Sequence, residues 1–111
     1  MADGLRQDAR SSTAIASMPA YLVGQIRVTD PEQWQRYLER VGATFAPHGG
    51  EVLWRGVKAA ELARSAHGDR IVVARFADLA ALRAWHDSPE YQALVALREA
   101  GAEVVLTAYQ G

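Results

Sequence analysis

The stretch YLVGQIRVTDPEQWQRYLERVGATF, residues 21–45, changes from a hydrophobic period of two to a period of 3.6 at one point. Residues 21–29 alternate in hydrophobicity, which predicts a β-strand. One face of this strand carries Leu22, Gly24, Ile26 and Val28. The apolar residues that follow recur at helical spacing, as Trp34, Leu38, Val41 and Phe45. The sequence therefore predicts a strand that leads directly into an amphipathic helix.

The boundaries of this helix carry specific capping signals. Asp30 is suited to cap its N-terminus, Pro31 suits the first helical position, and Gln33 is placed to complete a capping box. Pro47 disfavours further helix, and Gly49-Gly50 provides a turn. We therefore expect the helix to begin after Asp30 and to end before Pro47.

The second half of the chain repeats the strand–helix–strand order. Residues 70–76 are predicted to form a strand because Ile71-Val72-Val73 are β-branched. A second helix is predicted to begin at Leu79, break at Asp87, restart at Ser88-Pro89-Glu90 and end at Gly101. Ser88 is interpreted as a helix cap, because adjacent residues such as His86-Asp87-Ser88 cannot form a catalytic relay.

Two further alternating segments complete the pattern, at residues 51–55 and 103–109. The connection over residues 57–68 is rich in alanine and is predicted to hold one helical turn at residues 59–64. The resulting order is β-α-β-β-α-β, and right-handed crossovers place both helices on one face of the sheet. The predicted fold class is α+β, a ferredoxin-like unit with a four-stranded antiparallel sheet.

Composition limits the class of protein. A chain of 111 residues fits one domain, which we place at residues 19–111 after a disordered extension at residues 1–18 with Met18 as an alternative start. The net charge of −1 and the absence of a basic stripe argue against nucleic acid as a partner. No apolar stretch approaches the roughly 20 residues that span a bilayer, and the first 17 residues lack the apolar core of a signal peptide. The lack of cysteine excludes disulfides and is compatible with the cytoplasm, where we expect the protein.

The sheet face that the helices leave uncovered has a mixed character. It is predicted to carry Val23, Gln25, Arg27, Ile71, Val73, Arg75, Val105, Thr107 and Tyr109. The second strand adds Leu53 and Arg55 in one phase, or Val52 and Trp54 in the other. An apolar patch of this breadth is costly in a monomer, so we expect a homodimer that pairs through the sheet faces.

Three arginines on this predicted face offer a candidate anion site. Arg27, Arg55 and Arg75 would converge on a small carboxylate by bidentate contacts if all three shared the face. The alternative is that each pairs with a nearby acid or lies exposed at a strand end. A register shift of one residue would move any of them to the other face.

The histidines suggest little metal chemistry. His48, His67 and His86 show no metal-ligand spacing, so no metal and no cofactor is expected. His48 precedes Gly49-Gly50 at a predicted sheet mouth, which makes it the candidate for acid–base catalysis, although a loop histidine is more often simply exposed. Among the tryptophans, Trp85 lies near the predicted helix break and is placed to face a pocket.

A family pattern runs through the domain. It comprises Pro19-Ala20-Tyr21, Asp30-Pro31 with Tyr37, His48-Gly49-Gly50, Trp54-Arg55-Gly56, Arg70-Ile71-Val72-Val73 with Phe76, Ala84-Trp85, Ser88-Pro89-Glu90-Tyr91-Gln92, Arg98 and Gly111. This pattern resembles the Domain of Unknown Function 1330 family within the dimeric α/β-barrel superfamily. The resemblance implies a ferredoxin-like fold and a sheet-to-sheet homodimer, and it implies no established activity. Arg75 departs from the family pattern, where an acid usually precedes the phenylalanine.

Three functions remain open at this point. The first is a small-molecule pocket between sheet and helices, anchored by Arg55, Arg75, Trp85, Tyr91 and Arg98, with His48 as its acid or base. The second is a cofactor-free monooxygenase for an electron-rich aromatic substrate, an activity found in the wider superfamily that the resemblance points to. The third is a binding or assembly module without catalysis. Whether the protein is an enzyme is therefore left open.

Overall fold

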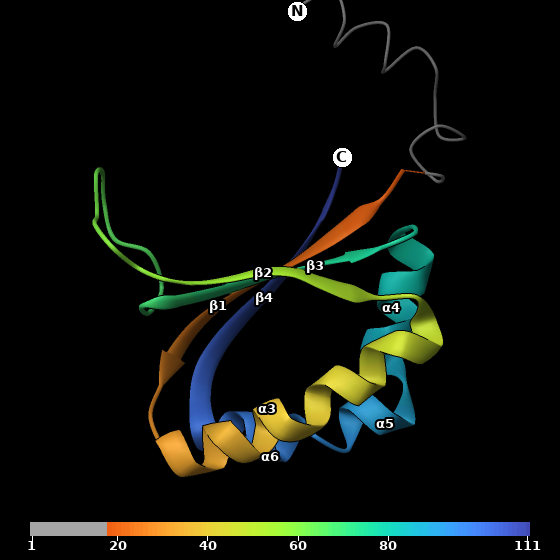
Figure 1. Cartoon of the computed structure of the whole chain (residues 1–111), viewed down its shortest axis with the longest axis horizontal. Helices are drawn as coiled ribbons and strands as arrows, with labels where there is room; N and C mark the ends of the chain where they lie inside the picture. Colours follow the sequence, from red (N-terminus) through yellow and green to blue (C-terminus); the bar gives the residue numbers. More distant parts are fainter. Residues whose placement is uncertain (1–17) are drawn as a thin grey trace, which may run out of the picture.

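The computed structural model describes residues 18–111, so the extension predicted before Met18 lies outside the described residues. Residues 18–111 form an antiparallel sheet in the order β2-β3-β1-β4, with their helices on one face (Figure 1). The elements are β1 (Ala20–Val28), α3 (Pro31–Phe45), the 3-10 turn η1 (Ala46–His48), β2 (Glu51–Val57), β3 (Arg70–Phe76), α4 (Leu79–Asp87), α5 (Pro89–Gln92), α6 (Val95–Gly101) and β4 (Ala102–Gln110). The ferredoxin-like α+β fold predicted from the sequence is confirmed.

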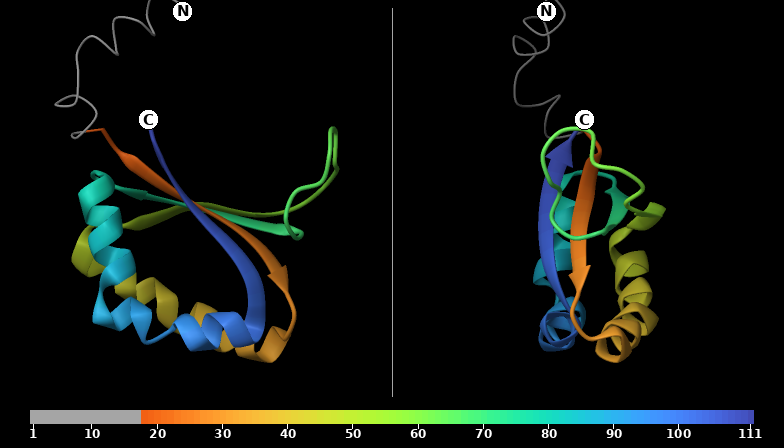
Figure 2. Two further views of the ribbon diagram at one scale, coloured as in Figure 1. Left: turned by 180° about the vertical axis from the view of Figure 1, so that it is seen from behind. Right: turned by 90° about the vertical axis from the view of Figure 1, so that its left-hand side faces the viewer.

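The central strand β1 sets which residues enter the core. It pairs antiparallel with both β3 and β4, so residues opposite one another share a face. Leu22 and Ile26 are buried at 5% and 4% exposure, as the alternation predicts. They face the apolar stripe of α3, whose buried members include Trp34, Val41 and Phe45. The core therefore lies between the sheet and the helices, and no helix of residues 18–111 covers the other sheet face (Figure 2).

The start of α3 is tied to the end of α6. Asp30 caps α3 by accepting hydrogen bonds from the amides of Glu32 and Gln33. The amide of Asp30 donates to the carbonyl of Gly101 at 3.0 Å and not to the side chain of Gln33, so the second hydrogen bond of the predicted capping box does not form. A Cβ atom on Gly101 would lie 2.5 Å from the backbone nitrogen of Trp34. Glycine is required at this position because the two helix ends approach closely.

The second helix is divided more than the sequence suggests. The predicted break after Asp87 is confirmed, and Ser88 caps α5 by accepting from the amide of Tyr91. A further break separates α5 from α6, where the amide of Leu94 donates to the carbonyl of Tyr91 at 2.8 Å. This i to i−3 bond tightens the turn, and the helical segments bend around the core.

The helical turn predicted at residues 59–64 is wrong. The connection between β2 and β3 is an irregular loop that rises away from the helices (Figures 1 and 2). The carboxylate of Glu61 accepts from the ammonium of Lys58 and from the amide of Ala66. Arg64 adopts a left-handed conformation with φ of 61°. The loop therefore folds around a side-chain carboxylate, which competes with helical hydrogen bonds.

A β-bulge at Leu53 decides the phase of β2. Before it, Val52 pairs with Ala74, and after it, Trp54 pairs with Val73. Val52 therefore shares the helix-facing side with Ala74, whereas Trp54 shares the uncovered side with Val73, and the next residue, Arg55, turns back to the helix-facing side. Both phases considered for this strand assumed regular alternation, and neither holds over its whole length.

No helix in residues 18–111 combines the length and hydropathy needed to cross a membrane.

Two glycine substitutions test the packing of the helix ends. We expect Gly101→Ala to lower the free energy of unfolding by about 1–3 kcal/mol, because the added methyl group overpacks the backbone of Trp34. Gly42 lies inside α3, and a Cβ atom there would meet nothing within 4 Å. Gly42→Ala should therefore raise stability by roughly 0.5–1 kcal/mol through helix propensity. Urea denaturation at one fixed protein concentration measures the free energy of unfolding of both variants. Equal changes in the two variants would contradict this packing.

Candidate functional site

A hollow of about 230 Å³ opens on the helix-facing side of the sheet, between α3 and the neighbouring strands β2 and β3. Its floor is apolar, formed by Ile26, Trp34 and Leu38. Two arginines lie among its lining residues, Arg55 from β2 and Arg70 from β3. The hollow thus combines an apolar floor with two cations.

The sheet register brings the two arginines to the same face. Arg55 pairs with Val72, and Arg70 pairs with Ile26, and both partners pack in or against the core. Neither arginine forms an ion pair or side-chain hydrogen bond with another residue of 18–111. Because these two guanidinium groups have no acidic partner among the described residues, their positive charge is available to an anion in the hollow.

A smaller cavity of about 30 Å³ lies deeper between sheet and helices. It shares Ile26, Trp34, Leu38 and Arg55 with the hollow, so the two spaces adjoin. Further walls come from the aromatic residues Tyr37, Phe45 and Trp85. A water molecule occupies roughly 30 Å³ in the liquid, so this inner space takes one small group.

Behind the inner cavity, three polar side chains form a hydrogen-bonded chain. The Nη1 atom of Arg98 donates to the hydroxyl of Tyr91 at 3.0 Å, and the hydroxyls of Tyr91 and Tyr37 lie 3.0 Å apart. Tyr91 is fully buried, and Tyr37 is exposed by only 6%. The chain connects the cation of Arg98 to the wall of the inner cavity.

The electrostatics keep Tyr37 in its neutral form. Burial raises the pKa of Tyr37 well above its usual range, and the neighbouring hydroxyl of Tyr91 adds to this rise, while Arg98 and Arg55 oppose it. Burial would lower the pKa of Arg98, but its hydrogen bonds to Tyr91 and Glu99 outweigh this and raise it. A neutral phenol and a charged guanidinium therefore stand at the two ends of the chain.

Trp85 is a wall of the inner cavity. Its ring stacks on Phe45 with centroids 4.9 Å apart, and only 1% of the residue is exposed. Its indole nitrogen donates to Thr44 Oγ1 at 2.9 Å, and Thr44 donates to the carbonyl of Val41. The polar atom of Trp85 is thus satisfied within the protein, which leaves the ring as an apolar surface.

The convergence of three arginines predicted from the sequence is wrong. Arg27 and Arg75 lie on the uncovered side of the sheet, where Arg27 forms an ion pair with Glu103 and Arg75 lies 4.0 Å from Glu51. Arg55 lies on the opposite side because the bulge at Leu53 shifts the register. A ligand role for Arg27 or Arg75 stays a prediction that would involve the other face.

His48 lies in the 3-10 turn after α3 and is half-buried. Its ring forms no hydrogen bond or ion pair with another residue of 18–111, and it lines neither the hollow nor the inner cavity. Its role as an acid or base stays a prediction. The described residues contain no group of three or more histidine, aspartate or glutamate side chains arranged to hold a metal ion.

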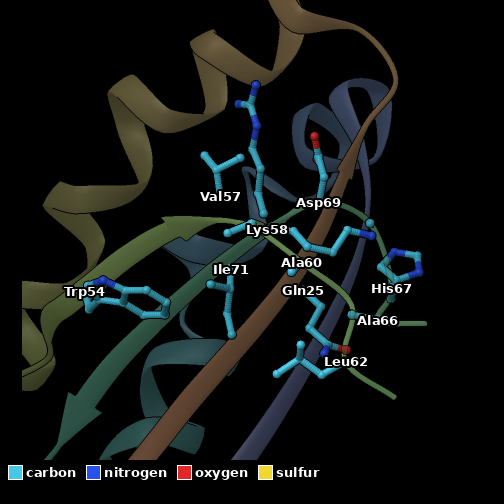
Figure 3. Close-up of a pocket in the computed structure, with 13 residues that line it drawn as sticks. Gln25, Trp54, Val57, Lys58, Ala60, Leu62, Ala66, His67, Asp69 and Ile71 are labelled. Atoms are coloured by element: carbon cyan, nitrogen blue, oxygen red, sulfur yellow. The ribbon is translucent and has the colours of Figure 1, made fainter. Parts of the chain in front are cut away.

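A second groove, with a volume of about 520 Å³, lies on the uncovered face and shares Val57, Arg70 and Ile71 with the hollow. Figure 3 shows Gln25, Trp54 and Ile71 from three strands along this groove, with Leu62 and His67 of the β2–β3 loop at its other end. Trp54 is 56% exposed and Leu62 is 95% exposed. His67 Nε2 lies 2.9 Å from the carbonyl of Glu103, which fastens the loop to β4. This outer groove is mostly apolar.

Two residues of the site were not chosen from the sequence as ligand contacts. Arg70 was counted only as a strand residue and as part of the family pattern, although its alternation with Val72 and Ala74 already indicates the helix-facing side. Tyr37 was noted only as part of the family pattern. Its helical spacing from Trp34 and Val41 places it on the buried face of α3, but its contact with Tyr91 depends on tertiary packing.

The fold and this site define a ferredoxin-like α+β protein with a cationic hollow between its sheet and its helices. The family model described as "Domain of unknown function (DUF1330)" matches residues 19–111, and the chain belongs to this family. No curated protein matches the chain.

Solved structures share the fold. A protein of unknown function from Rhodopseudomonas palustris superposes with a TM-score of 0.74 at 20% identity, covering 100% of this chain and 93% of that one. SnoaB, a cofactor-independent oxygenase from Streptomyces nogalater, gives 0.63 at 16% identity and covers 85% and 93%. A dimeric ferredoxin-like protein of unknown function from Thermobifida fusca gives 0.61 at 21% identity and covers 86% and 92%. At these identities the likeness concerns the fold alone.

The raised pKa of Tyr37 predicts a stability that depends on pH in the alkaline range. The folded protein holds the phenolic proton more tightly than the unfolded chain, whose tyrosines titrate near pH 10. This contribution is complete below about pH 10 and is lost as the pH rises above it. Tyr37→Phe should therefore lose less stability than the wild type between neutral and strongly alkaline pH. Urea denaturation across this range tests the prediction, and parallel pH profiles for the two proteins would contradict it.

Proposed function

We propose that this protein binds a small carboxylate in the hollow between α3 and strands β2 and β3. The observation that carries the proposal is the pair of guanidinium groups of Arg55 and Arg70, which have no acidic partner among residues 18–111. A guanidinium presents a planar fork of donors that matches a carboxylate. The apolar floor beneath this pair suits the carbon body of such a ligand.

The lining of the hollow favours a ligand with a ring. Trp34 lines both the hollow and the inner cavity, and its indole face packs well against a flat conjugated group. The adjoining hollow of about 230 Å³ is below the usual range for drug-sized ligands, which favours a molecule of about one ring. A benzoate-like acid is therefore the probe of choice.

We also propose that two copies of the chain pair through the uncovered sheet faces. Trp54 and Tyr109 are each 56% exposed on that side, and Val105 is 42% exposed. A broad apolar surface of this kind is unfavourable in water and is typical of an interface. The name of the related T. fusca protein describes it as dimeric, which is consistent with the same arrangement here.

A cofactor-independent oxygenase reaction is the second candidate. Two observations favour it, the aromatic walls of the inner cavity and the shared fold with the S. nogalater oxygenase. Such a reaction requires an electron-rich aromatic substrate that itself supplies electrons to oxygen. Oxygen uptake with polycyclic phenols would favour this candidate, whereas binding without uptake leaves the protein as a binding module.

Substitution of the two arginines tests the carboxylate site. We expect Arg55→Ala and Arg70→Ala each to weaken benzoate binding by about 10–100-fold, the value of one charge-assisted hydrogen bond. Arg83→Ala is the matched control, because Arg83 is exposed on α4 outside the hollow, and it should bind as the wild type does. Isothermal titration calorimetry measures the affinities. Equal affinities in all four proteins, or no binding by any of them, would contradict the proposal.

Native mass spectrometry tests the pairing. The wild-type protein should contain two copies, and the same spectrum reports any ligand retained through purification. Trp54→Glu should be monomeric because it places a charge on the apolar face, whereas Arg83→Glu should remain dimeric. A monomeric wild type would rule out the sheet-to-sheet dimer.

A further inference from the structure

The hydrogen-bonded chain of Arg98, Tyr91 and Tyr37 has one more donor hydrogen than it has hydrogen bonds. One N–H of Arg98 and the two phenolic O–H groups supply three hydrogens, but the chain contains only two contacts. The contact between Arg98 and Tyr91 uses the first hydrogen, and the contact between the two hydroxyls uses the second. The third, a phenolic hydrogen, has no acceptor among residues 18–111.

The surroundings decide which tyrosine carries this free hydrogen. Tyr91 is fully buried and lines neither the hollow nor the inner cavity, so a free hydrogen there would remain desolvated without an acceptor. Of the two tyrosines, Tyr37 is the one that lines the inner cavity, so it is the one with access to an occupant. The favoured direction therefore runs from Arg98 to Tyr91, from Tyr91 to Tyr37, and from Tyr37 into the cavity.

The direction of this hydrogen-bonded chain makes its last donor, the Tyr37 hydroxyl, a stronger donor. Arg98 is a cation, and its N–H polarises the Tyr91 hydroxyl, which in turn polarises the hydroxyl of Tyr37. Because burial holds the pKa of Tyr37 well above its usual range, the phenol keeps its proton and stays a donor. The nearby cation of Arg55 further favours an oxygen with negative or partially negative charge in the cavity.

We propose that the ligand is a small keto or aldehyde acid whose carbonyl oxygen accepts a hydrogen bond from Tyr37 while its carboxylate is bound by Arg55 and Arg70. This inference rests on the proposed function, which supplies the carboxylate end. The inner cavity of about 30 Å³ takes one small group, which fits a single carbonyl at the inner end of a flat ligand. Tyr37 is thus the residue that selects among carboxylates.

Paired probes of the same shape separate this inference from the proposed function. The para and meta isomers of formylbenzoate carry a carbonyl acceptor, and the corresponding vinylbenzoates replace it with carbon. In wild-type protein one formyl isomer should bind about tenfold more tightly than its vinyl counterpart, the upper end for one hydrogen bond. Tyr37→Phe should abolish this preference and leave vinylbenzoate binding unchanged. Tyr91→Phe keeps the Tyr37 hydroxyl but loses its polarisation, so the preference should shrink without vanishing.

Calorimetry on these three proteins and on Arg55→Ala gives distinct outcomes. If both probes bind equally to the wild type and both depend on Arg55, the carbonyl inference is overturned while the carboxylate site stands. If the wild type shows no preference for the formyl probe and Tyr91→Phe does, the hydrogen-bonded chain runs from Tyr37 to Tyr91, and the inference is also overturned. If no probe binds to any protein, the inference and the proposed function fail together. Thermal unfolding of each variant checks that the phenylalanine substitutions leave the fold intact.

Discussion

The bulge at Leu53 determines the chemistry of each face of the sheet. One additional residue in β2 turns Trp54 outward and Arg55 inward, whereas regular alternation would have kept Val52 and Trp54 together. The inward turn places a cation beside the apolar floor of the hollow, next to Arg70. The outward turn adds an exposed tryptophan to a face that no helix of the described residues covers. Both the candidate pocket and the candidate interface therefore depend on this single irregularity.

On the helix side of the sheet, the buried polar side chains form hydrogen bonds with one another or with nearby backbone groups. The indole of Trp85 is bonded to Thr44, and Ser88 both caps α5 and donates to the carbonyl of Trp85. No buried side-chain nitrogen or oxygen among the described residues lacks a partner. Against this background, the free hydrogen of Tyr37 and the charges of Arg55 and Arg70 are available to bind a ligand in the spaces that these residues line. They lie on adjoining spaces, which is why we assign them to one site.

Local sequence signals predicted the elements well, and contacts between distant segments account for the errors. Strand β3 and the cap at Ser88 follow from β-branched residues and from the Ser-Pro-Glu order, which act within a few residues. The bulge depends on how β2 pairs with β3, so alternation within β2 alone does not reveal it. The same holds for the loop after β2, where the carboxylate of Glu61 replaced the expected helical turn.

The candidate site was only partly predictable for the same reason. Arg55, Trp85, Tyr91 and Arg98 were selected from the sequence, and all four lie on the helix side of the sheet or in its helices. Tyr37 meets Tyr91 across 54 residues of sequence, a contact that no local pattern encodes. Arg27 and Arg75 were assigned to the uncovered face correctly, but their acidic neighbours Glu103 and Glu51 became evident only from strand pairing.

A crystal structure of the protein grown with para- or meta-formylbenzoate would test the central claim most directly. The account predicts electron density for the carboxylate beside Arg55 and Arg70, and for the carbonyl oxygen within hydrogen-bonding distance of the Tyr37 hydroxyl. Density for the acid in the outer groove beside Trp54 and Leu62, with the helix-side hollow empty, would contradict it.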